Sequence, residues 1–477
     1  MVKKNFLSLT LFLTLFLVII TAPINLFYKL PLGDPYVRGF FIDYLVPKFY
    51  LYDIFMLSFI LVGGIYLINK HQEKLKSKIQ NFRLNTQHLV PLHLVYLIFI
   101  GLSIFFIIRQ FFTANSVASV YWLIKLTEAG LFGLVLFKLI KLTKRRYQAL
   151  TIFHHRLSFI GLIKLALAFA VIFQTTLGLY QFHFQRNLLS YQYLGETNLS
   201  QPVGLAKVSL CHQEKVLAYG TTAHPNILAG VVLFYSLLLF ALFRHKKTTK
   251  SKKTNGYLNL TVYGLTFIAP LITIGITLSF SAFLGFIFGL FGLIASLYKP
   301  KLTKLVLAVG LITFFLMPVL IQLANTQAPG HFSLSRRAML NQAAIKMWQA
   351  FPLTGVGLNN FTVYVEQFSQ SNEVVRFPQP AHHVGLLFLA ENGALGIVIV
   401  AVLIILSQLR TKSLRSKAKN SSKITLNQRP MFDPKLFIIV LLPLASLDHW
   451  LITQPVGLVI LTLVVSTKAI LKRNSQF

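Results

Sequence analysis

Long apolar runs dominate the hydrophobic pattern of this 477-residue chain. Runs of about 17–25 apolar residues are long enough to cross a bilayer as helices. Membrane barrel strands would instead alternate apolar and polar residues. We therefore predict an all-α, polytopic membrane helix bundle that forms one integral membrane domain over residues 1–477. About twelve spans are expected, at residues 6–28, 49–69, 90–109, 118–140, 157–180, 225–243, 257–278, 281–298, 303–321, 384–407, 435–450 and 453–470.

The composition supports this class, because 55% of the residues are hydrophobic and only 12% are charged. A soluble protein of this length could not bury so much apolar surface. The first span follows Lys3 and Lys4, is too long for a signal-peptide core and has no small-residue cleavage site. We expect it to be retained as a membrane anchor.

Basic residues concentrate in every second connection between the expected spans. These connections are KLKSKIQNFR (74–83), KLTKRR (141–146), RHKKTTKSKK (244–253), KPKLTK (299–304), RTKSLRSKAK (410–419) and LKR (471–473). Positively charged loops stay in the cytoplasm, so we predict a multi-pass protein of the cytoplasmic membrane with both termini inside. The net charge of +34 is scattered over these short loops. It therefore indicates contact with anionic lipid, and no nucleic-acid partner is expected.

Two long segments are expected on the outer side, 181–224 and 322–383. The larger one, 322–383, lies between spans nine and ten. Its stretch SLSRRAMLNQAAIKMWQAF (333–351) repeats apolar residues at helical spacing and is followed by Pro352. We expect amphipathic helices in this extracytoplasmic loop to lie on the bundle and cover a cavity.

Polar residues mark the points where the outer segments enter the membrane. His224 and Asn226 belong to an HPN triplet at the start of span six, where a helix-entry turn with Pro225 at the first position is an equally good interpretation. His382 and His383 stand at the start of span ten.

An acidic residue, Glu391, lies nine residues beyond His382 and therefore about 13 Å deeper along the helix. A carboxylate at that depth is costly unless it is paired or functional. Our preferred interpretation is a hydrogen-bonded contact between helices, near Lys125 or Glu128.

Three motifs occur in order on the predicted outer side: GTTAHPNILAG, SRRAMLNQAAIKMWQAFPLTGVGLNNF and QPAHHVGLLFLAENGALGI. Their order, sidedness and spacing resemble the superfamily of O-antigen ligases and O-antigen polymerases, the membrane glycosyltransferases of bacterial surface polysaccharides. The resemblance implies transfer of a glycan from an undecaprenyl-diphosphate carrier to an acceptor hydroxyl of a lipid, polysaccharide or protein. It further implies an inverting reaction at the outer face of the membrane that requires neither a metal nor a cofactor.

The resemblance also assigns roles to residues. His382 matches the histidine at the end of the family's outer loop and is the expected catalytic residue. Arg336 and Arg337 lie where the family carries arginine for phosphate, although a solvated helix face explains one of them equally well. The expected substrate-binding residues are Arg336, Arg337, His224, Asn226, His383, Lys207 and Glu391.

One position departs from the family. The stretch TLSFSAFLG (277–285) has Phe280 where the family places an arginine that binds the carrier diphosphate. A phenyl ring cannot donate hydrogen bonds to phosphate, so another cation must substitute or turnover is lost. Near the C-terminus, DHWLITQPVG places Asp448 and His449 at the membrane edge, where we expect a paired structural element.

Two other functions remain open. A degenerate family member would bind lipid-linked glycan without turning it over. A twelve-span secondary transporter would use the buried Lys125–Glu128 pair, and would show repeated halves around a cavity at the membrane midplane. The single cysteine, Cys211, excludes an intrachain disulfide.

Overall fold

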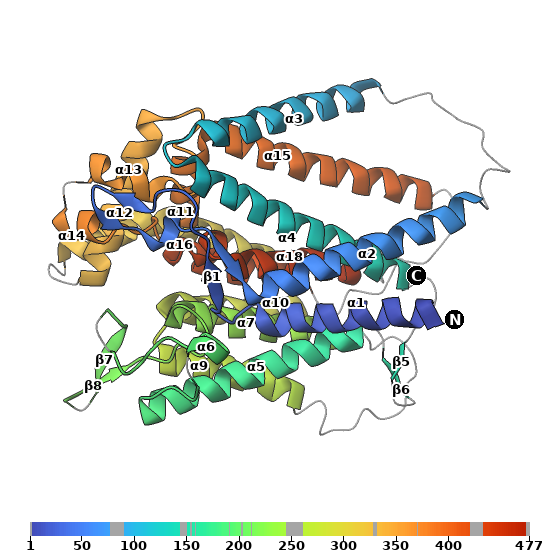
Figure 1. Ribbon diagram of the computed structural model, residues 1–477, viewed down its shortest axis with the longest axis horizontal. Coiled ribbons are helices and arrows are strands. Elements are labelled where there is room, and N and C mark those ends of the chain that lie inside the picture. Colours follow the sequence, from blue (N-terminus) through green and yellow to red (C-terminus); the bar gives the residue numbers. More distant parts are fainter. Residues whose placement is uncertain are drawn as a thin grey trace.

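The computed structural model describes residues 2–76, 90–143, 150–152, 155–157, 159–189, 191–201, 204–210, 212–244, 261–327, 332–369, 371–419 and 433–473. Most of this part of the chain is helical, and its strands form short two-stranded sheets (Figure 1). The helices are α1 (Val2–Thr21), α2 (Leu51–Lys76), α3 (Val90–Arg109), α4 (Ser116–Thr143), α5 (Phe159–Phe184), α6 (Tyr191–Leu194), α7 (Pro225–Arg244), α9 (Ala269–Thr277), α10 (Phe280–Tyr298), α11 (Pro300–Gln327), α12 (Phe332–Ala350), α13 (Phe361–Phe368), α14 (Asn372–Arg376), α15 (Val384–Lys419), α16 (Lys435–Leu447), α17 (Trp450–Thr453) and α18 (Pro455–Arg473), with 3-10 turns η1 (Asp43–Leu45) and η3 (Gln110–Phe112) and a π-helical turn η4 (Gly264–Ile268). Antiparallel pairs join β1 (Phe27–Lys29) to β4 (Lys48–Tyr50), β2 (Tyr36–Val37) to β3 (Phe40–Phe41), β5 (Leu150–Ile152) to β6 (His155–Leu157), and β7 (Lys207–Leu210) to β8 (Gln213–Val216).

The helical class and the multi-pass membrane character are confirmed. Six described helices are long and apolar enough to cross a membrane: Leu51–Lys70, Phe159–Phe184, Pro225–Arg244, Phe280–Tyr298, Lys301–Gln327 and Val384–Leu406. Five shorter apolar helices fall in other predicted spans, at Leu7–Thr21, Phe99–Phe112, Thr261–Thr277, Lys435–Leu447 and Pro455–Ser466. The full number of twelve spans stays a prediction.

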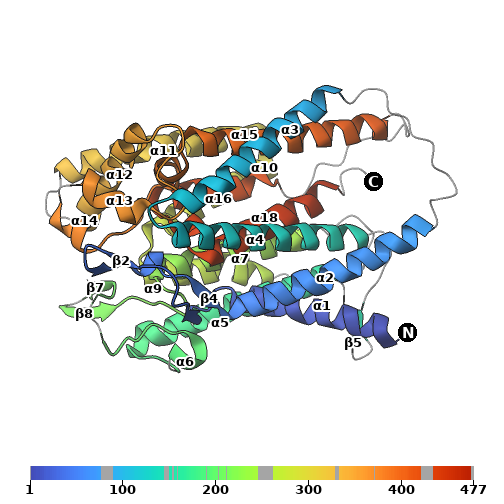
Figure 2. The same cartoon turned by 45° about the horizontal axis from the view of Figure 1, so that its top comes forward.

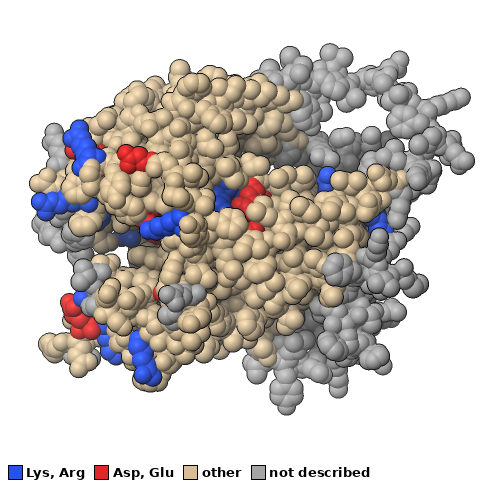
Figure 3. All heavy atoms as spheres, in the orientation of Figure 1, with Lys and Arg blue, Asp and Glu red and all other residues tan. Residues whose placement is uncertain are grey.

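The two ends of the bundle differ. Both termini lie at one end, whereas α12, α13, α14 and the β7–β8 hairpin lie at the other (Figures 1 and 2). The two long segments predicted on the outer side, 181–224 and 322–383, therefore meet at the end opposite the termini. On the face drawn in Figure 3, most coloured side chains lie at the end with the long loops, and a small group of both signs lies near the middle of the bundle. Of the predicted basic connections, residues 77–83, 144–146 and 245–253 lie outside the described residues.

Helix α7 is the centre of the bundle. It is apolar on all sides, as expected for a helix surrounded by others, and it packs against α5, α9, α10 and α18. Gly230 allows Trp450 of α17 to lie directly against α7, because a Cβ at Gly230 would be 2.2 Å from Trp450 Cζ2. This contact sets α17 beside the start of α7.

Helices α10 and α16 approach closely through small residues. A Cβ on Gly285 would lie 2.3 Å from Leu444 Cδ1, and one on Gly292 would lie 2.8 Å from Leu436 Cδ2. Small residues at such contacts allow membrane helices to pack by close van der Waals contact. The packing brings the first turn of α10 next to the C-terminal end of α16.

Helix α12 coincides with the helix predicted at 333–351, and it buries Leu340, Ala344 and Met347 completely. The loop after it docks into a break in α15 at Gly393, where φ is 58°. There the Val356 N–H donates to the Ala390 carbonyl at 2.9 Å. The loop thus replaces hydrogen bonds that the broken helix cannot make itself, and it fixes α12 to α15.

Candidate functional site

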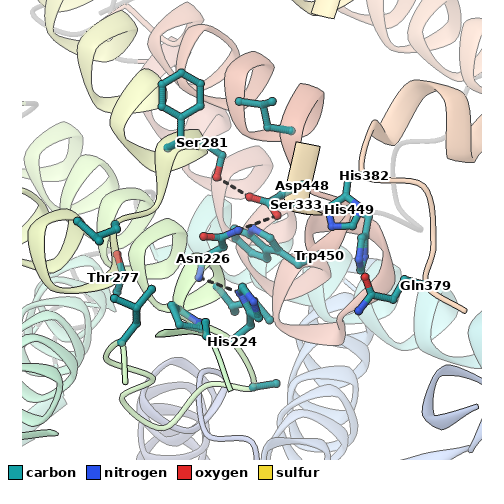
Figure 4. Close-up of a pocket in the computed structure, with 18 of the residues that line it drawn as sticks. His224, Asn226, Thr277, Ser281, Ser333, Gln379, His382, Asp448, His449 and Trp450 are labelled. Carbon is teal, nitrogen blue, oxygen red and sulfur yellow. Dashed lines mark hydrogen bonds between the residues drawn. The ribbon is translucent and has the colours of Figure 1, made fainter. Parts of the chain in front are cut away.

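A cavity of about 790 Å³ lies among helix ends at the end of the bundle that carries the long loops. Its wall includes the starts of α7, α10 and α12, the ends of α9 and α16, and α17. Residues from β7 and η1 complete it. The cavity is therefore built from segments that are far apart in the sequence, and Figure 4 shows how ten of its residues lie.

The first wall is the start of α7, where Pro225 occupies the first helical position, as proline often does. The Asn226 N–H donates to His224 Nδ1 at 3.2 Å, and the Asn226 side-chain amide donates to Asp448 Oδ1 at 3.1 Å. Because its Nδ1 accepts a hydrogen bond, the neutral His224 ring carries its proton on Nε2. Both predicted HPN residues therefore line the cavity.

Asp448 links three helices at the base of the cavity. Its Oδ1 accepts from Asn226, in the first turn of α7, and its Oδ2 accepts from the Ser281 hydroxyl, in the first turn of α10 (Figure 4). Asp448 itself follows the last residue of α16, Leu447. A carboxylate near two helix N-termini is stabilised by both helix dipoles.

Two histidines stand edge to face on the opposite side of the cavity. The ring centroids of His382 and His449 are 5.1 Å apart with an interplanar angle of 81° (Figure 4). His382 precedes α15, and its Nδ1 is buried without a hydrogen-bond partner. His449 lies between α16 and α17, and its Nδ1 is 2.6 Å from Thr453 Oγ1.

The surroundings favour the neutral form of these rings. Burial lowers the pKa of His382 well below its ordinary value, and the charges of His449 and Arg337 lower it further. Burial likewise lowers the pKa of His449 to about 3, with His224 and Arg337 contributing. Desolvation also lowers the pKa of His224, although the charge of Asp448 opposes this shift. At neutral pH all three histidines are uncharged and can accept a hydrogen bond.

Two arginines from the start of α12 supply positive charge to the cavity. Arg336 donates to the Phe377 carbonyl, and Arg337 Nη1 donates to the Ser333 hydroxyl at 2.7 Å. Within the described part of the chain, Arg337 forms no ion pair with a carboxylate, and its buried Nε has no partner. Its charge is therefore available to an anion. Lys207 also lines the cavity, but it pairs with Glu214 across the β7–β8 hairpin at 3.1 Å.

Two further predicted residues lie outside this cavity. His383 Nε2 is 2.9 Å from the Phe314 carbonyl and its Nδ1 accepts from the Leu386 N–H, so His383 holds the start of α15 in place. Burial lowers the pKa of His383. Glu391 accepts from the Phe361 N–H at 3.3 Å.

The partner that we predicted for Glu391 was wrong, because Glu391 contacts Phe361 and not Lys125 or Glu128. Lys125 instead pairs with Asp53 and with Glu128, the latter at 3.2 Å. The break in α15 explains this difference, because it turns the Glu391 region toward the docked loop rather than toward α4. The spacing of hydrophobic residues in the sequence does not predict such a break.

Several cavity residues escaped the sequence analysis. Tyr44, Ser281 and Trp450 line the cavity together with Asp448 and His449. Asp448 and His449 do not bond to each other, as a paired element would require, because each has a separate partner. The available signal was a polar DHW triplet at the end of an apolar run, which has the same form as the HPN and AHH triplets.

Tyr44 and possible metal ligands are candidates for further reactive groups of the site. Burial raises the pKa of Tyr44 to about 12, so its hydroxyl stays protonated, and its ring lies 5.8 Å from that of His449. Among the described residues, no group of three or more histidine, cysteine or acidic side chains is arranged to hold a metal ion.

Comparison with known proteins gives one match. Residues 265–401 match the family model of the O-antigen ligases, a stretch that runs from η4 to α15 and contains Phe280, Arg336, Arg337 and His382. The matched stretch contains the second and third of the three motifs, and it supports the resemblance drawn from them. No curated protein and no solved structure matches the chain.

Proposed function

We propose, because residues 265–401 match the family model of the O-antigen ligases, that this membrane protein transfers a glycan from a polyprenyl-diphosphate carrier to an acceptor hydroxyl. The acceptor is a lipid, a polysaccharide or a protein, and the reaction takes place at the outer face of the cytoplasmic membrane. One observation carries the proposal. His224, Asn226, Arg336, Arg337 and His382, which come from three separate segments, line a single cavity.

The cavity suits a diphosphate leaving group. When the glycosyl bond breaks, its electrons pass to the diphosphate, whose added charge must be stabilised. Arg336 and Arg337 provide two guanidinium groups, which bind phosphate oxygens in a fixed geometry. The positive ends of the α7 and α10 dipoles face the same space.

Phe280 stands where the family places an arginine, and we propose that the arginines of α12 supply the missing positive charge. Phe280 lines the same cavity as Arg336 and Arg337. A cation that approaches from α12 can therefore reach the space that the family's arginine reaches from α10. We propose that the diphosphate binds on the α12 side of the cavity.

The rim of the cavity is apolar where α9 meets α10. Leu278 and Phe280 line the cavity, and their exposed fractions are 54% and 62%. Exposed apolar side chains at the edge of a membrane bundle face lipid at little cost. This edge is our proposed entry for the polyprenyl chain.

The acceptor hydroxyl needs a hydrogen-bond acceptor as it attacks. We propose that His382 contacts this hydroxyl, since its ring is neutral and lines the cavity beside the arginines. Attack from the side opposite the diphosphate forms the new C–O bond as the bond to the carrier breaks, which inverts the anomeric carbon. The cavity lies among helix ends rather than at mid-bundle, an arrangement that favours transfer over the transport alternative.

The test is turnover by the purified full-length protein in nanodiscs, with a polyprenyl-diphosphate oligosaccharide and a panel of candidate acceptors. We expect wild type to form product, and His382→Ala and Arg337→Ala to lose about 100-fold or more, as is typical of acid–base and charge-stabilising groups. His183→Ala and Arg186→Ala are matched controls, because both residues are exposed and lie outside the cavity lining. Equal turnover by wild type and His382→Ala would remove His382 from the mechanism. Tight donor binding without product would instead indicate a degenerate member of the family.

A further inference from the structure

The three histidines of the cavity differ in how their protons are fixed. His224 Nδ1 accepts the Asn226 N–H, so its Nε2 is a donor. His382 Nδ1 is buried without a partner, so no hydrogen bond at this nitrogen selects a tautomer. His449 alone has a side-chain hydroxyl at hydrogen-bond distance from a ring nitrogen among these three.

The hydroxyl of Thr453 determines the tautomer of His449. Thr453 Oγ1 donates its only proton to the His449 carbonyl at 3.1 Å, the usual bond of a threonine to the carbonyl four residues earlier. The same oxygen lies 2.6 Å from His449 Nδ1. We assign it as the acceptor of the Nδ1 proton, because its own proton is given to the carbonyl. The proton of the neutral ring is then on Nδ1, which leaves a lone pair on Nε2.

The Nε2 atom of His449 is positioned to accept a proton in the cavity. Among the described residues, Nε2 of His449 makes no hydrogen bond, and the residue lines the cavity. Two rings contact that of His449 edge to face, Tyr44 at 5.8 Å and His382 at 5.1 Å between centroids. An oriented ring with a fixed tautomer is what a histidine base requires, and the second group that orients it is here a threonine.

We propose that His449 is a catalytic residue, and that its Nε2 accepts the proton of the acceptor hydroxyl during glycosyl transfer. This inference rests on the proposed function. The O–H bond of the acceptor breaks and its electron pair forms the bond to the anomeric carbon. The bond from that carbon to the carrier oxygen breaks, its electrons stay on the diphosphate beside Arg336 and Arg337, and the proton passes to His449. Because the hydroxyl has one proton, which His449 accepts, His382 then orients the hydroxyl by donating a hydrogen bond to its oxygen.

The charges around His449 also link its basicity to donor binding. The groups that face its ring are Tyr44, His382, His224 and Arg337. Burial and the charge of Arg337 lower the pKa of His449 in the empty cavity. A diphosphate bound to the arginines would offset their charge and raise the affinity of the ring for a proton, so the base would become effective when the donor is in place.

The test compares three variants in the turnover assay, with donor affinity measured separately. His449→Asn keeps a donor near the Nδ1 position but has no basic nitrogen, and we expect turnover to fall about 100-fold or more while donor affinity changes less than about twofold. Thr453→Val removes the group that fixes the tautomer and should lower turnover about tenfold. Thr453→Ser keeps the hydroxyl and should restore it. His183→Asn, on the exposed surface of α5, is the matched control.

A second readout separates a base from a merely structural residue. A more acidic acceptor alcohol needs less help from a base, so the deficit of His449→Asn should shrink with that acceptor, whereas a packing defect would affect both acceptors equally. Wild-type turnover with an equally active His449→Asn overturns the role of His449 and leaves the proposed function standing. Parallel loss of donor binding and turnover also overturns it. A wild type that makes no product overturns both.

Discussion

Replacing Asp448 should weaken the structure around the cavity more than its single side chain implies. Its two carboxylate oxygens accept from Asn226 and Ser281, so it joins α7 and α10 to the end of α16. Asp448 is 6% exposed and Ser281 is 3% exposed. Loss of the carboxylate therefore leaves the buried Ser281 hydroxyl without its acceptor and with little access to water.

The magnitude follows from the two hydrogen bonds. A bond to a charged group contributes about 1.5–3 kcal/mol, and a neutral one about 0.5–1.5 kcal/mol. The Asn226 amide can bond to water in the cavity and the Ser281 hydroxyl lies 3.3 Å from Ser279 Oγ, so we take the low end of the range. We expect Asp448→Ala to lower the free energy of unfolding by about 3 kcal/mol. Asp448→Asn, which can keep both contacts without charge, should lower it by about 1–2 kcal/mol.

The assay is unfolding by SDS titration in mixed micelles, followed by tryptophan fluorescence. Ser281→Ala and the double variant Ser281→Ala/Asp448→Ala complete a double-mutant cycle, in which we expect a coupling of about 1–2 kcal/mol. Asp34→Asn is a suitable control, because Asp34 is exposed and, among the described contacts, its carboxylate accepts only from the Tyr36 N–H in its own turn. A loss below about 1 kcal/mol for Asp448→Ala, or a coupling near zero, would refute the account of Asp448 as a link between helices.

Three further predictions concern the bundle. Lys125→Met should destabilise the protein by about 3–5 kcal/mol in the same SDS assay, because it leaves the buried carboxylates of Asp53 and Glu128 without a cation; adding Asp53→Asn and Glu128→Gln should restore most of the loss. Gly393→Ala should cost at least about 2 kcal/mol, since φ is 58° and a Cβ would lie 2.5 Å from backbone atoms of the docked loop. Gly64→Ala, where a Cβ meets nothing within 4 Å, should be neutral or stabilising. Finally, burial lowers the pKa of the three cavity histidines below the ordinary value of about 6.5, so the unfolded chain binds more protons below that pH. The thermal midpoint should therefore be highest above about pH 6.5 and fall as the pH falls; a midpoint that rises on acidification would contradict this.

The sequence predicts the helices well because membrane helices carry a simple signal. Each predicted span overlaps a described helix, although the span predicted at 6–28 runs past the end of α1 at Thr21, and the helix at 333–351 appears as α12. The residue at which a helix ends is harder to predict, since polar residues at a helix end have the same composition as those in a loop. The span predicted at 435–450 ends at Leu447, so Asp448 and His449 lie in the turn that follows.

The candidate site was only partly accessible from the sequence. His224, Arg336 and His382 were recognisable because they occur in motifs. Asp448 and His449 join them only through the close approach of α10 to α16 and of α17 to α7, which glycines allow. Such contacts join residues more than 150 positions apart, as Ser281 and Asp448 show, and no local pattern reports them.

The docked loop holds α12, which carries Arg336 and Arg337, in a fixed position against α15. Helix α12 would be a mobile surface element if only its ends held it, and a mobile arginine would bind a diphosphate poorly. The loop that follows α12 is instead bonded into the break of α15, and the Ala394 N–H donates to the Pro352 carbonyl at 2.9 Å. His382 precedes that same α15, so the arginines and this histidine belong to one packed unit. Their spacing is then independent of α10, whose first turn is tied separately to Asp448. The geometry between His382 and the α12 arginines therefore does not depend on the side chain at position 280.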